Sequence, residues 1–563
     1  MPRIQAVNPA GLTTTPPGAD AAIGGRLAVD IRRFPWIRRL ASDYAFDYAR
    51  LADFFAGDPG DPGAWRDVIA RASNHRRQRH AVVEVLQAQQ QRRGAPAEAQ
   101  SATTILADPT SVAVVTGQQA GLFGGPLFTL LKALTAIQLA ERVRAEHDVP
   151  AVAVFWVDAE DHDWNEVKAC RVLDAEQAPR SVAIGDLPGA HSGPVARVRL
   201  NETITSALSE LQSILPPTEF TPALLDDLRR CYEPGSGMAD AFSRWLERVL
   251  GPRGLVVFDS SDPAAKPLVA DVFAREIAHP GDTARLAAEA GSALAARGYH
   301  AQVTPNEGSL ALFHMNAGRE PIKVLAGNFQ VGESTQSQAA LLERVREAPA
   351  EFSPNVLLRP IVQDTLFPTV CYVAGPSELA YLGQLRRVYA AFDVPMPLIQ
   401  QRGTATIVDS NGMRFLSRHD VSIEVLRAQD EAALNELLIA QLPSSVEVAM
   451  QVAGDTIEQR MDALAREVPR IDATLEGATR STLSRMQDDL KKLHAKIVQA
   501  AKRKDETLRR QFHHAQTQAF PGGHPQEREI GFVTFLNKYG PSLIDRLLAT
   551  LPAEMGTHWV ITI

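Results

Sequence analysis

Two buried apolar runs separated by one helical segment restrict the fold of this chain more than any other feature of its sequence. The runs are VAVVTG at residues 112–117 and AVAVFWV at residues 151–157, and leucines recur at helical spacing between Leu127 and Leu134. Short apolar runs bounded by glycine-rich or polar turns are typical of strands that are buried in a parallel sheet. A strand, a helix and a second strand form a right-handed βαβ unit, so we expect a doubly wound α/β core.

The chain is long enough for several domains, and its charge and cysteine content exclude some classes of partner. Its 563 residues carry a formal net charge of -8, which repels a phosphate backbone, so we expect no nucleic-acid partner. Cys170, Cys231 and Cys371 are too few and too far apart for a disulfide framework or a CxxC metal site. The longest apolar stretch, residues 149–157, is about half as long as a membrane span. We therefore expect a cytoplasmic protein with no membrane contact.

Five segments are predicted along the chain. A third strand is expected in GLVVFDS at residues 254–260, after which the α/β pattern is interrupted by a helix at residues 283–297. The strand-like sequences HAQVT (300–304) and LALFHM (310–315) follow it. The segments are an N-terminal helical segment packing on the core (1–100), the first part of the core (101–281), a connecting α+β subdomain (282–350), the second part of the core (351–420) and a helical coiled-coil domain (421–563).

Two apolar stripes with heptad spacing predict a helical hairpin near the C-terminus. The first consists of Ile457, Met461, Leu464 and Val468, and the second of Leu483, Met486, Leu490, Leu493 and Ile497. Pro469 interrupts the helix between the stripes, and Asp472 can cap the helix that follows. We expect an antiparallel helical coiled coil, with one long kinked helix as the alternative.

A glycine-rich loop, TGQQAGLFGGPLFTLLK (116–132), links the first strand to its helix. Glycines let the backbone approach a ligand closely, and a helix start offers free N–H groups, so we expect a phosphate or carboxylate here. The spacing matches neither the Walker pattern nor GxGxxG, and a tight packing turn is the alternative. Lys132 is expected to lie too deep in the helix to reach a ligand. The candidate substrate-binding residues of the loop are Thr116, Gly117, Gln118, Gln119, Gly121, Gly124 and Gly125.

An acidic turn, FWVDAEDHDWNEV (155–167), follows the second strand. Carboxylates gathered at the end of a buried strand repel one another unless a cation relieves them, so a bound amine or metal is expected. A histidine flanked by carboxylates suits a base for an ammonium nucleophile. No HExxH motif is present, so of these two we predict a bound amine and no metal site. Metal binding and a plain solvated turn are the alternatives. The candidate catalytic residues are Glu160, Asp161, His162 and Asp163.

A third motif, at residues 353–385, places an arginine before a buried strand, TVCYVA, and a GPSE turn after it. A buried arginine can fork onto a carboxylate, and the GPSE turn resembles a helix start. The alternative for Arg359 is an internal ion pair with Asp364. The candidate substrate-binding residues here and just downstream are Arg359, Gln363, Asp364, Tyr372, Gly375, Pro376, Glu378, Tyr381 and Arg402.

Together these stretches resemble the cysteine-adding enzymes of bacillithiol biosynthesis, the BshC family. The motifs that carry the resemblance are GQQAGLFGGPLFTLLK, FWVDAEDHDWNEV, SPNVLLRP, YVAGPSELAYLGQL, PLIQQR, FPGGHPQER and NKYG, which span nearly the whole chain in order. The resemblance implies a Rossmann-like core with a connecting subdomain, a coiled-coil domain and a homodimer. It also implies a ligase that joins L-cysteine to the amine of glucosaminyl-malate and so yields bacillithiol.

An amide cannot form from a free carboxylate and an ammonium at neutral pH, so this activity requires activation. ATP or another activating nucleotide is expected, with another carrier or a partner protein as the alternative. We expect His162 or an adjacent carboxylate to deprotonate the amine, and the N–H groups of Gly124 and Gly125 to hold an oxyanion or phosphate. Arg359 or Arg402 would bind the malyl carboxylates, and Glu160 or Asp163 the amine.

Two other functions are compatible with the same motifs. A coiled-coil protein that binds a metabolite without catalysis could use the same loops, although three such turns are costly features for a scaffold. An aminoacyl-transferring or nucleotidyl-transferring enzyme of similar fold is the second alternative, and it would release pyrophosphate with cysteine and ATP alone.

Overall fold

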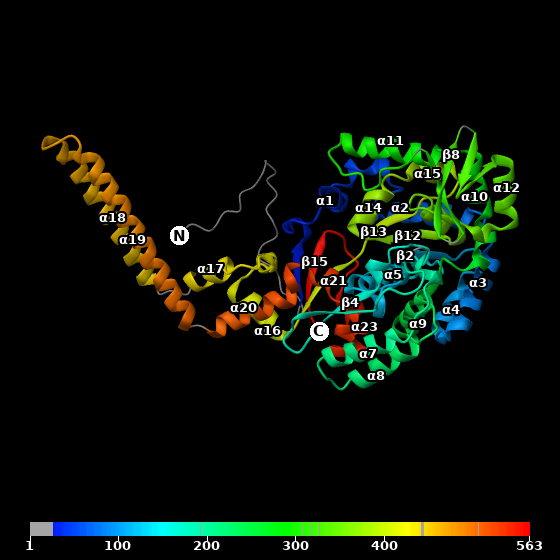
Figure 1. The fold of residues 1–563 in the computed structure, drawn as a ribbon, viewed down its shortest axis with the longest axis horizontal. Helices are drawn as coiled ribbons and strands as arrows, with labels where there is room; N and C mark the ends of the chain where they lie inside the picture. The colour runs from blue at the N-terminus through cyan, green and yellow to red at the C-terminus, as the bar shows by residue number, and fades with distance from the viewer. Residues whose placement is uncertain are drawn as a thin grey trace.

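A five-stranded parallel sheet lies at the centre of the computed structural model, which describes residues 26–563 except 192, 307, 317, 326, 441–443 and 505. Its strand order is β13-β12-β2-β3-β6, and every neighbouring pair is parallel. The strands are β2 (Val112–Gln118), β3 (Ala151–Val157), β6 (Val256–Asp259), β12 (Thr369–Ala374) and β13 (Leu398–Gln401). Figure 1 shows this sheet within a broad α/β body from which a helical arm projects. The predicted Rossmann-like, doubly wound core is confirmed.

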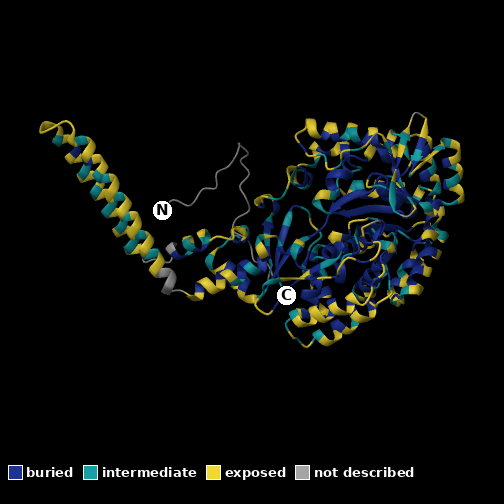
Figure 2. Ribbon diagram, viewed as in Figure 1, coloured by how far each residue is buried: buried dark blue, intermediate teal, exposed yellow. Residues whose placement is uncertain are grey.

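The apolar runs of β2 and β3 are continuous because both faces of the sheet are buried (Figure 2). Val112 and Val114 belong to one hydrophobic cluster, whereas Ala113 and Val115 belong to a second cluster on the other face. Helix α5 (Leu127–His147) packs on β2 and β3 and is buried along much of its length. Pro126 precedes α5 as its N-cap residue, and the helix begins at Leu127.

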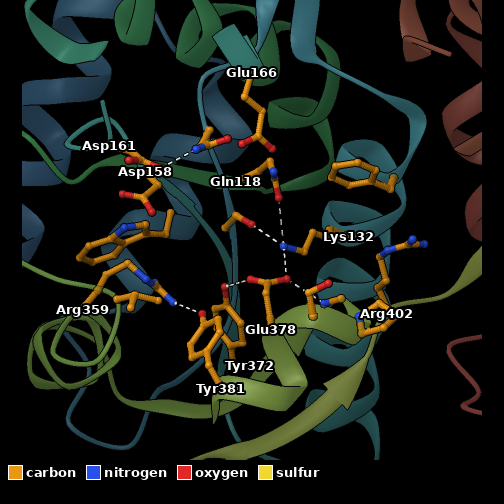
Figure 3. Close-up of a pocket in the computed structure, with 18 of the residues that line it drawn as sticks. Gln118, Lys132, Asp158, Asp161, Glu166, Arg359, Tyr372, Glu378, Tyr381 and Arg402 are labelled. Carbon is orange, nitrogen blue, oxygen red and sulfur yellow. Dashed lines mark hydrogen bonds and ion pairs between the residues drawn. The ribbon is translucent and has the colours of Figure 1, made fainter. Parts of the chain in front are cut away.

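The direction of winding reverses between β2 and β12. The chain runs outward from β2 through β3 to β6, and later returns to place β12 and β13 on the other side of β2. The carboxyl ends of β2 and β12 therefore open into a crevice, which is where ligands bind in sheets of this kind. Gln118 at the end of β2 and Tyr372 of β12 face a common space there (Figure 3).

The segment predicted as a connecting subdomain contains α11 (Asp282–Ala296) and four strands of an antiparallel sheet of order β10-β9-β8-β7-β11, whose edge strand β11 lies beyond the predicted boundary at residue 350. The strands are β7 (Ser309–Met315), β8 (Arg319–Leu325), β9 (Asn328–Val331), β10 (Ser334–Ser337) and β11 (Phe352–Pro354). The predicted helix and the strand LALFHM are confirmed, but HAQVT is not a strand. The Gln384 amide accepts from Val303 N and donates to Val303 O, at 3.1 and 3.0 Å, so the backbone of Val303 in this segment is satisfied by a side chain instead of a neighbouring strand.

A small sheet brings the two ends of the described chain together. β1 (Arg26–Asp30) pairs antiparallel with β15 (Thr557–Thr562), which pairs parallel with β14 (Thr404–Val408). Sequence reasoning predicted neither β1 nor β15. The first 25 residues of the predicted N-terminal segment lie outside the described residues, and helices α1 (Arg39–Phe46), α2 (Pro62–Asn74), α3 (Arg79–Arg93) and α4 (Ala97–Ile105) follow β1. The proposed domain boundaries stay a prediction.

The projecting arm is the predicted antiparallel hairpin. It consists of α18 (Ser444–Glu467) and α19 (Leu475–Lys504), joined by a turn that contains Pro469 (Figure 1). The arm stays largely accessible, and the side chains of Leu464 and Leu493 in its stripes are 49% and 48% exposed (Figure 2). The two helices thus leave part of their apolar stripes uncovered. None of the helices in the described part of the chain combines the length and apolarity that a bilayer span requires.

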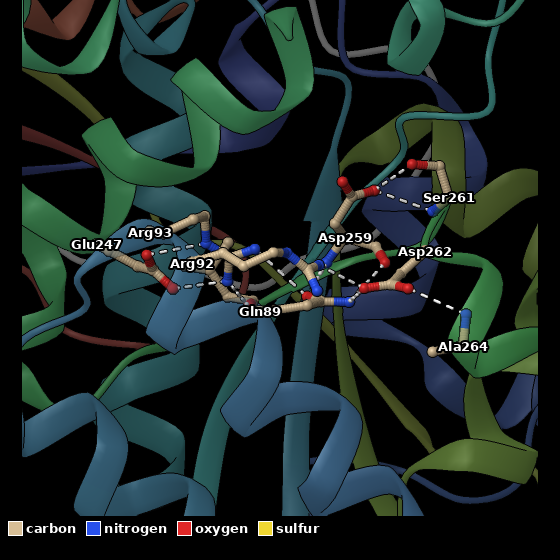
Figure 4. Close-up of polar contacts among 9 residues, drawn as sticks. Gln89, Arg92, Arg93, Glu247, Asp259, Ser261, Asp262 and Ala264 are labelled. Carbon is tan, nitrogen blue, oxygen red and sulfur yellow. Dashed lines mark hydrogen bonds and ion pairs between the residues drawn. The ribbon is translucent and has the colours of Figure 1, made fainter. Parts of the chain in front are cut away.

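A buried polar network attaches α3 to the end of β6 (Figure 4). Arg93 forms a bidentate pair with Glu247 of α9 (Met238–Leu250), at 2.7 and 3.0 Å, and also donates to Val257 O at 2.7 Å. Gln89 accepts from Asp259 N at 2.9 Å. The glutamines and arginines of this helix, which looked merely polar in the sequence, therefore dock it onto the core.

Glu247→Gln should destabilise the protein strongly, because it leaves the Arg93 guanidinium buried without its counter-charge. Both side chains of this pair are 2% exposed. We expect a loss of about 3 kcal/mol in the free energy of unfolding, measured by urea denaturation. Arg92→Gln is the matched control, since the Arg92 side chain that pairs with Asp262 is 59% exposed and should contribute less than about 1 kcal/mol. Equal effects of the two substitutions would contradict this interpretation.

Candidate active site

A cavity of about 390 Å³ opens at the reversal point of the central sheet. Its walls come from the ends of β2, β3 and β12, from the first turn of α13 (Arg359–Leu366) and from α14 (Pro376–Leu382). The volume lies within the range of small-molecule sites. The predicted residues that line it are Gly117, Gln118, Gln119, Asp161, Arg359, Tyr372, Gly375, Pro376, Glu378, Tyr381 and Arg402. All three sequence motifs therefore contribute to one cavity.

The predicted acidic catalytic residues are only partly brought to this cavity. Glu160 accepts a hydrogen bond from Lys266 at 2.5 Å, and both side chains are buried. His162 does not line the cavity: its ring is 67% exposed and lies beside Asp161. Asp163 caps α6 (Trp164–Val167) by accepting from Glu166 N at 3.2 Å. These placements give no support to Glu160, His162 or Asp163 as groups that contact a substrate.

The glycine-rich loop closes on itself instead of presenting free N–H groups. Gly124 N donates to Gly121 O and Gly125 N donates to Leu122 O, so the loop does not offer these groups to an oxyanion or to the phosphates of a nucleotide. Gly124 has a positive φ, and a Cβ there would lie 2.3 Å from the Phe532 ring. At Gly124 the loop is therefore a tight packing turn, which was the alternative to an anion-binding loop. Neither Gly121, Gly124 nor Gly125 lines the cavity.

Three further predicted residues lie behind the cavity wall. The Thr116 hydroxyl donates to Val373 O at 2.9 Å and links β2 to β12. Arg359 donates to Gln363 Oε1 at 3.0 Å, while Asp364 accepts from Gln363 and from Tyr389. Gln363 thus separates Arg359 from Asp364, and the ion pair considered from the sequence is not formed.

The floor of the cavity is a buried ion pair that the sequence did not predict. Lys132 Nζ lies 2.5 Å from Glu378 Oε2 and donates to Gly117 O at 2.6 Å (Figure 3). Glu378 also accepts from the Tyr372 hydroxyl and from Gly375 N, each at 2.7 Å. Burial lowers the pKa of Lys132. Burial would raise the pKa of Glu378, but Lys132 and the Gly375 N–H hold it below its ordinary value. Lys132 thus contributes to the cavity as part of a buried ion pair, and the expectation that it lies too deep to reach a ligand directly stays a prediction.

One wall of the cavity is acidic. Asp158 accepts no hydrogen bond on its carboxylate from any described residue, and burial raises its pKa while Arg359 opposes the shift. Burial also raises the pKa of Glu166, with further repulsion from Asp163 and Asp161. Asp161 is held by the Gln119 amide at 2.5 Å. This wall suits a bound ammonium group, and no metal site of three His, Cys, Asp or Glu ligands is found among the residues that the structure describes.

The arginines around the cavity differ in how much of their hydrogen-bonding capacity is already used. Arg402 forms a buried bidentate pair with Glu527 at 2.6 and 2.9 Å and donates to Gly403 O. Arg359 donates to Gln363 and to the Tyr381 hydroxyl at 2.9 Å, which leaves its remaining donors for a ligand. Arg359 is therefore better placed than Arg402 to bind a carboxylate.

Several lining residues were not among the predicted site residues, although Asp158 and Glu166 belong to the acidic turn where an amine was expected. They are Phe128, Lys132, Trp156, Asp158, Glu166, Arg319, Pro354, Asn355, Val356, Ser377 and Arg528. A lone charge in the apolar run LFTLLKALTAIQLA was the available signal for Lys132, because buried lysines are rare without a partner. Arg319 comes from β8 of the connecting sheet, and no local pattern pointed to it.

We expect Lys132 and Glu378 to be energetically coupled. Lys132→Met leaves a buried carboxylate and Glu378→Gln leaves a buried ammonium, so each substitution alone should cost about 3 kcal/mol or more. The double substitution should cost clearly less than the sum, with a coupling energy of at least about 1 kcal/mol in urea denaturation of all four proteins. Additive effects would show that the pair does not hold the cavity floor.

Comparisons with known proteins match both parts of the chain. The model described as "Bacillithiol biosynthesis BshC, N-terminal Rossmann-like domain" matches residues 28–403, and "Bacillithiol biosynthesis BshC, C-terminal coiled-coil domain" matches residues 405–563. A protein of Salinibacter ruber named "Putative cysteine ligase BshC" is 36% identical over 92% of this chain and 95% of its own length. Relatives with the same name in Chlorobaculum tepidum and Koribacter versatilis are 32% and 31% identical, over 89% and 92% of this chain and 92% and 96% of their own lengths.

Proposed function

The chain belongs to the BshC family, and from this membership and the charges of the cavity we propose that it is an enzyme that joins L-cysteine to the amine of glucosaminyl-malate. This reaction would be the last step of bacillithiol biosynthesis. The proposal rests on two side chains that line one cavity. Asp158 has a carboxylate that accepts no hydrogen bond from a described residue, and Arg359 has a guanidinium with unused donors. An amine and a neighbouring carboxylate are the two groups that glucosaminyl-malate presents close together.

Asp158 is the proposed base. An ammonium must lose a proton before its nitrogen can attack a carbonyl carbon, and the acceptor must lie within hydrogen-bond reach. Asp158 lines the cavity, its carboxylate is not engaged by any described side chain, and burial raises its pKa, which makes it a better proton acceptor than an ordinary aspartate. Asp161 on the same wall would hold the ammonium before deprotonation.

Arg359 is the proposed anchor for a malyl carboxylate. Gln363 and Tyr381 fix its guanidinium, so little side-chain entropy is lost when a carboxylate binds. Arg402, the other arginine considered from the sequence, is already neutralised by Glu527. The reagent that activates the cysteine carboxylate is not assigned to any residue, because the loop expected to cradle a nucleotide phosphate uses its own N–H groups.

The proposed reaction is tested by incubating the full chain with glucosaminyl-malate, cysteine and ATP and searching for the cysteinyl product by mass spectrometry. We expect product with the wild-type protein, and Asp158→Asn should reduce the rate at least about 10²-fold. The wild-type rate should fall as the pH drops through the pKa of Asp158, which lies above the ordinary value of about 3.9. His162→Gln is the control, and it should stay within about 3-fold of wild type because its ring lies outside the cavity.

Other results of these experiments would favour a different function or a different base. Thermal stabilisation by glucosaminyl-malate without product under any activating condition would favour a protein that only binds the metabolite. Release of pyrophosphate with cysteine and ATP alone would favour an aminoacyl-transferring or nucleotidyl-transferring enzyme. A large loss in His162→Gln with a normal rate in Asp158→Asn would overturn the assignment of the base.

We propose in addition that the protein is a homodimer and that the helical arm is its interface. The arm exposes Val448, Val452, Leu464, Met486 and Leu493, each between 42% and 58%. An isolated two-helix hairpin cannot cover a stripe of this kind, whereas a second copy of the same arm can. The heptad spacing of the stripes supports a helix-to-helix contact.

Leu464→Glu combined with Leu493→Glu should convert the dimer to a monomer, because two charges would be buried in the interface. The molar mass in solution, measured by light scattering after gel filtration, should fall to half. Arg480→Glu on α19 is the control, since its side chain pairs with Glu476 at the surface. A wild-type protein that is already monomeric would contradict the dimer.

A further inference from the structure

A second cavity, of about 450 Å³, shares a wall with the first. Gln118, Gln119, Phe128, Glu166 and Arg528 line both cavities. The second cavity lies beneath the glycine-rich loop, at Gly121 and Gly125, and is bounded on the other side by Cys170 and Arg171 of β4 (Ala169–Leu173). A ligand held in the second cavity would reach the wall that the two cavities share, and the amine bound in the first cavity is proposed to react near this wall.

Arg528 is a cation without a counter-charge at this shared wall. Its guanidinium forms no ion pair or hydrogen bond with any residue that the structure describes, and its neighbour Glu527 is engaged by Arg402. Arg528 is an exposed residue at the rim of the cavity, and the protein atoms around it and the nearby Arg402 lower its pKa, so a bound anion would stabilise its charged form. Arg171, on the opposite side, is already paired with Glu529. Arg528 is therefore the group of this cavity that is ready to bind a carboxylate.

The second cavity also contains a carboxylate that suits a bound ammonium and a buried hydroxyl without a hydrogen-bond partner. Glu166 faces both cavities, and burial together with Asp163 and Asp161 raises its pKa, so a nearby cation would stabilise its charged form. The Thr129 hydroxyl is fully buried, lines this cavity and has no hydrogen-bond partner among the described residues. A buried hydroxyl without a partner is unusual and indicates a missing ligand or water.

The rest of the wall suits a small thiol side chain. Phe128, Val167 and Ala169 present apolar surface, and Cys170 is a neutral group because burial raises the pKa of its thiol to about 12. A neutral buried thiol does not compete as a nucleophile. The cavity thus combines a cation, a carboxylate and a weakly polar pocket, which are the contacts that a small zwitterionic amino acid requires.

We propose that this adjoining cavity is the subsite for the amino-acid substrate, with the carboxylate at Arg528 and the ammonium at Glu166. The proposal rests on the function proposed above, which makes this amino acid L-cysteine. With the carboxylate at Arg528, its carbon lies at the wall that both cavities share. The amine and the carboxyl carbon of the two substrates then approach each other from opposite cavities.

Isothermal titration of the full chain with L-cysteine, alone and with glucosaminyl-malate present, tests this assignment. Arg528→Met should weaken cysteine binding at least about 10-fold and leave glucosaminyl-malate binding within about 3-fold of wild type. Arg528→Lys should retain part of the affinity because it keeps the charge. Arg359→Met is the matched control, with the opposite pattern. Thermal melting of each variant shows that it is folded.

Equal cysteine affinity in wild type and Arg528→Met would overturn the subsite, as would competition between cysteine and glucosaminyl-malate for one site. A wild-type protein that binds no cysteine, even with glucosaminyl-malate present, would overturn it as well. If cysteine binds through Arg528 but glucosaminyl-malate does not bind at all, the amino-acid subsite is supported and the proposed reaction fails.

Discussion

The buried ammonium of Lys132 connects the fold of this protein to its cavity. Lys132 lies on α5, which follows β2, and its partner Glu378 lies on α14, which follows β12. The ion pair therefore joins the helices that follow the two strands between which the winding of the sheet reverses. A charge buried without its partner is strongly destabilising, so the floor of the cavity exists only when both helices are docked. Packing of the core and assembly of the site are then one event.

Above this floor the charges of the cavity are separated. Asp158, Asp161 and Glu166 form one wall of the first cavity, whereas Arg359 provides a cation with unused donors. A substrate that carries both an amine and carboxylates can bind in this field in one orientation, because the reverse orientation brings like charges together. The second cavity repeats the arrangement, with Glu166 and Arg528 shared between the two. Two charged substrates could in this way be aligned by a few side chains.

Local patterns predicted the scaffold well because β2 and β3 are apolar on both faces, and such runs are legible without tertiary information. Strands β1 and β15 were missed because each depends on pairing with the other end of the chain. The three motifs do line one cavity, but neighbouring carboxylates diverge in a way that spacing cannot show. Glu160 turns to Lys266, far away in the sequence, while Asp158, two residues earlier, faces the cavity.

We propose that the cavity at the reversal point binds glucosaminyl-malate with its amine on the acidic wall. A crystal structure of the full chain with this compound would show where its charged groups bind. We expect the amine within hydrogen-bond distance of Asp158 and a malyl carboxylate on Arg359. A ligand bound in another part of the molecule, or bound here with its amine away from Asp158, would contradict it.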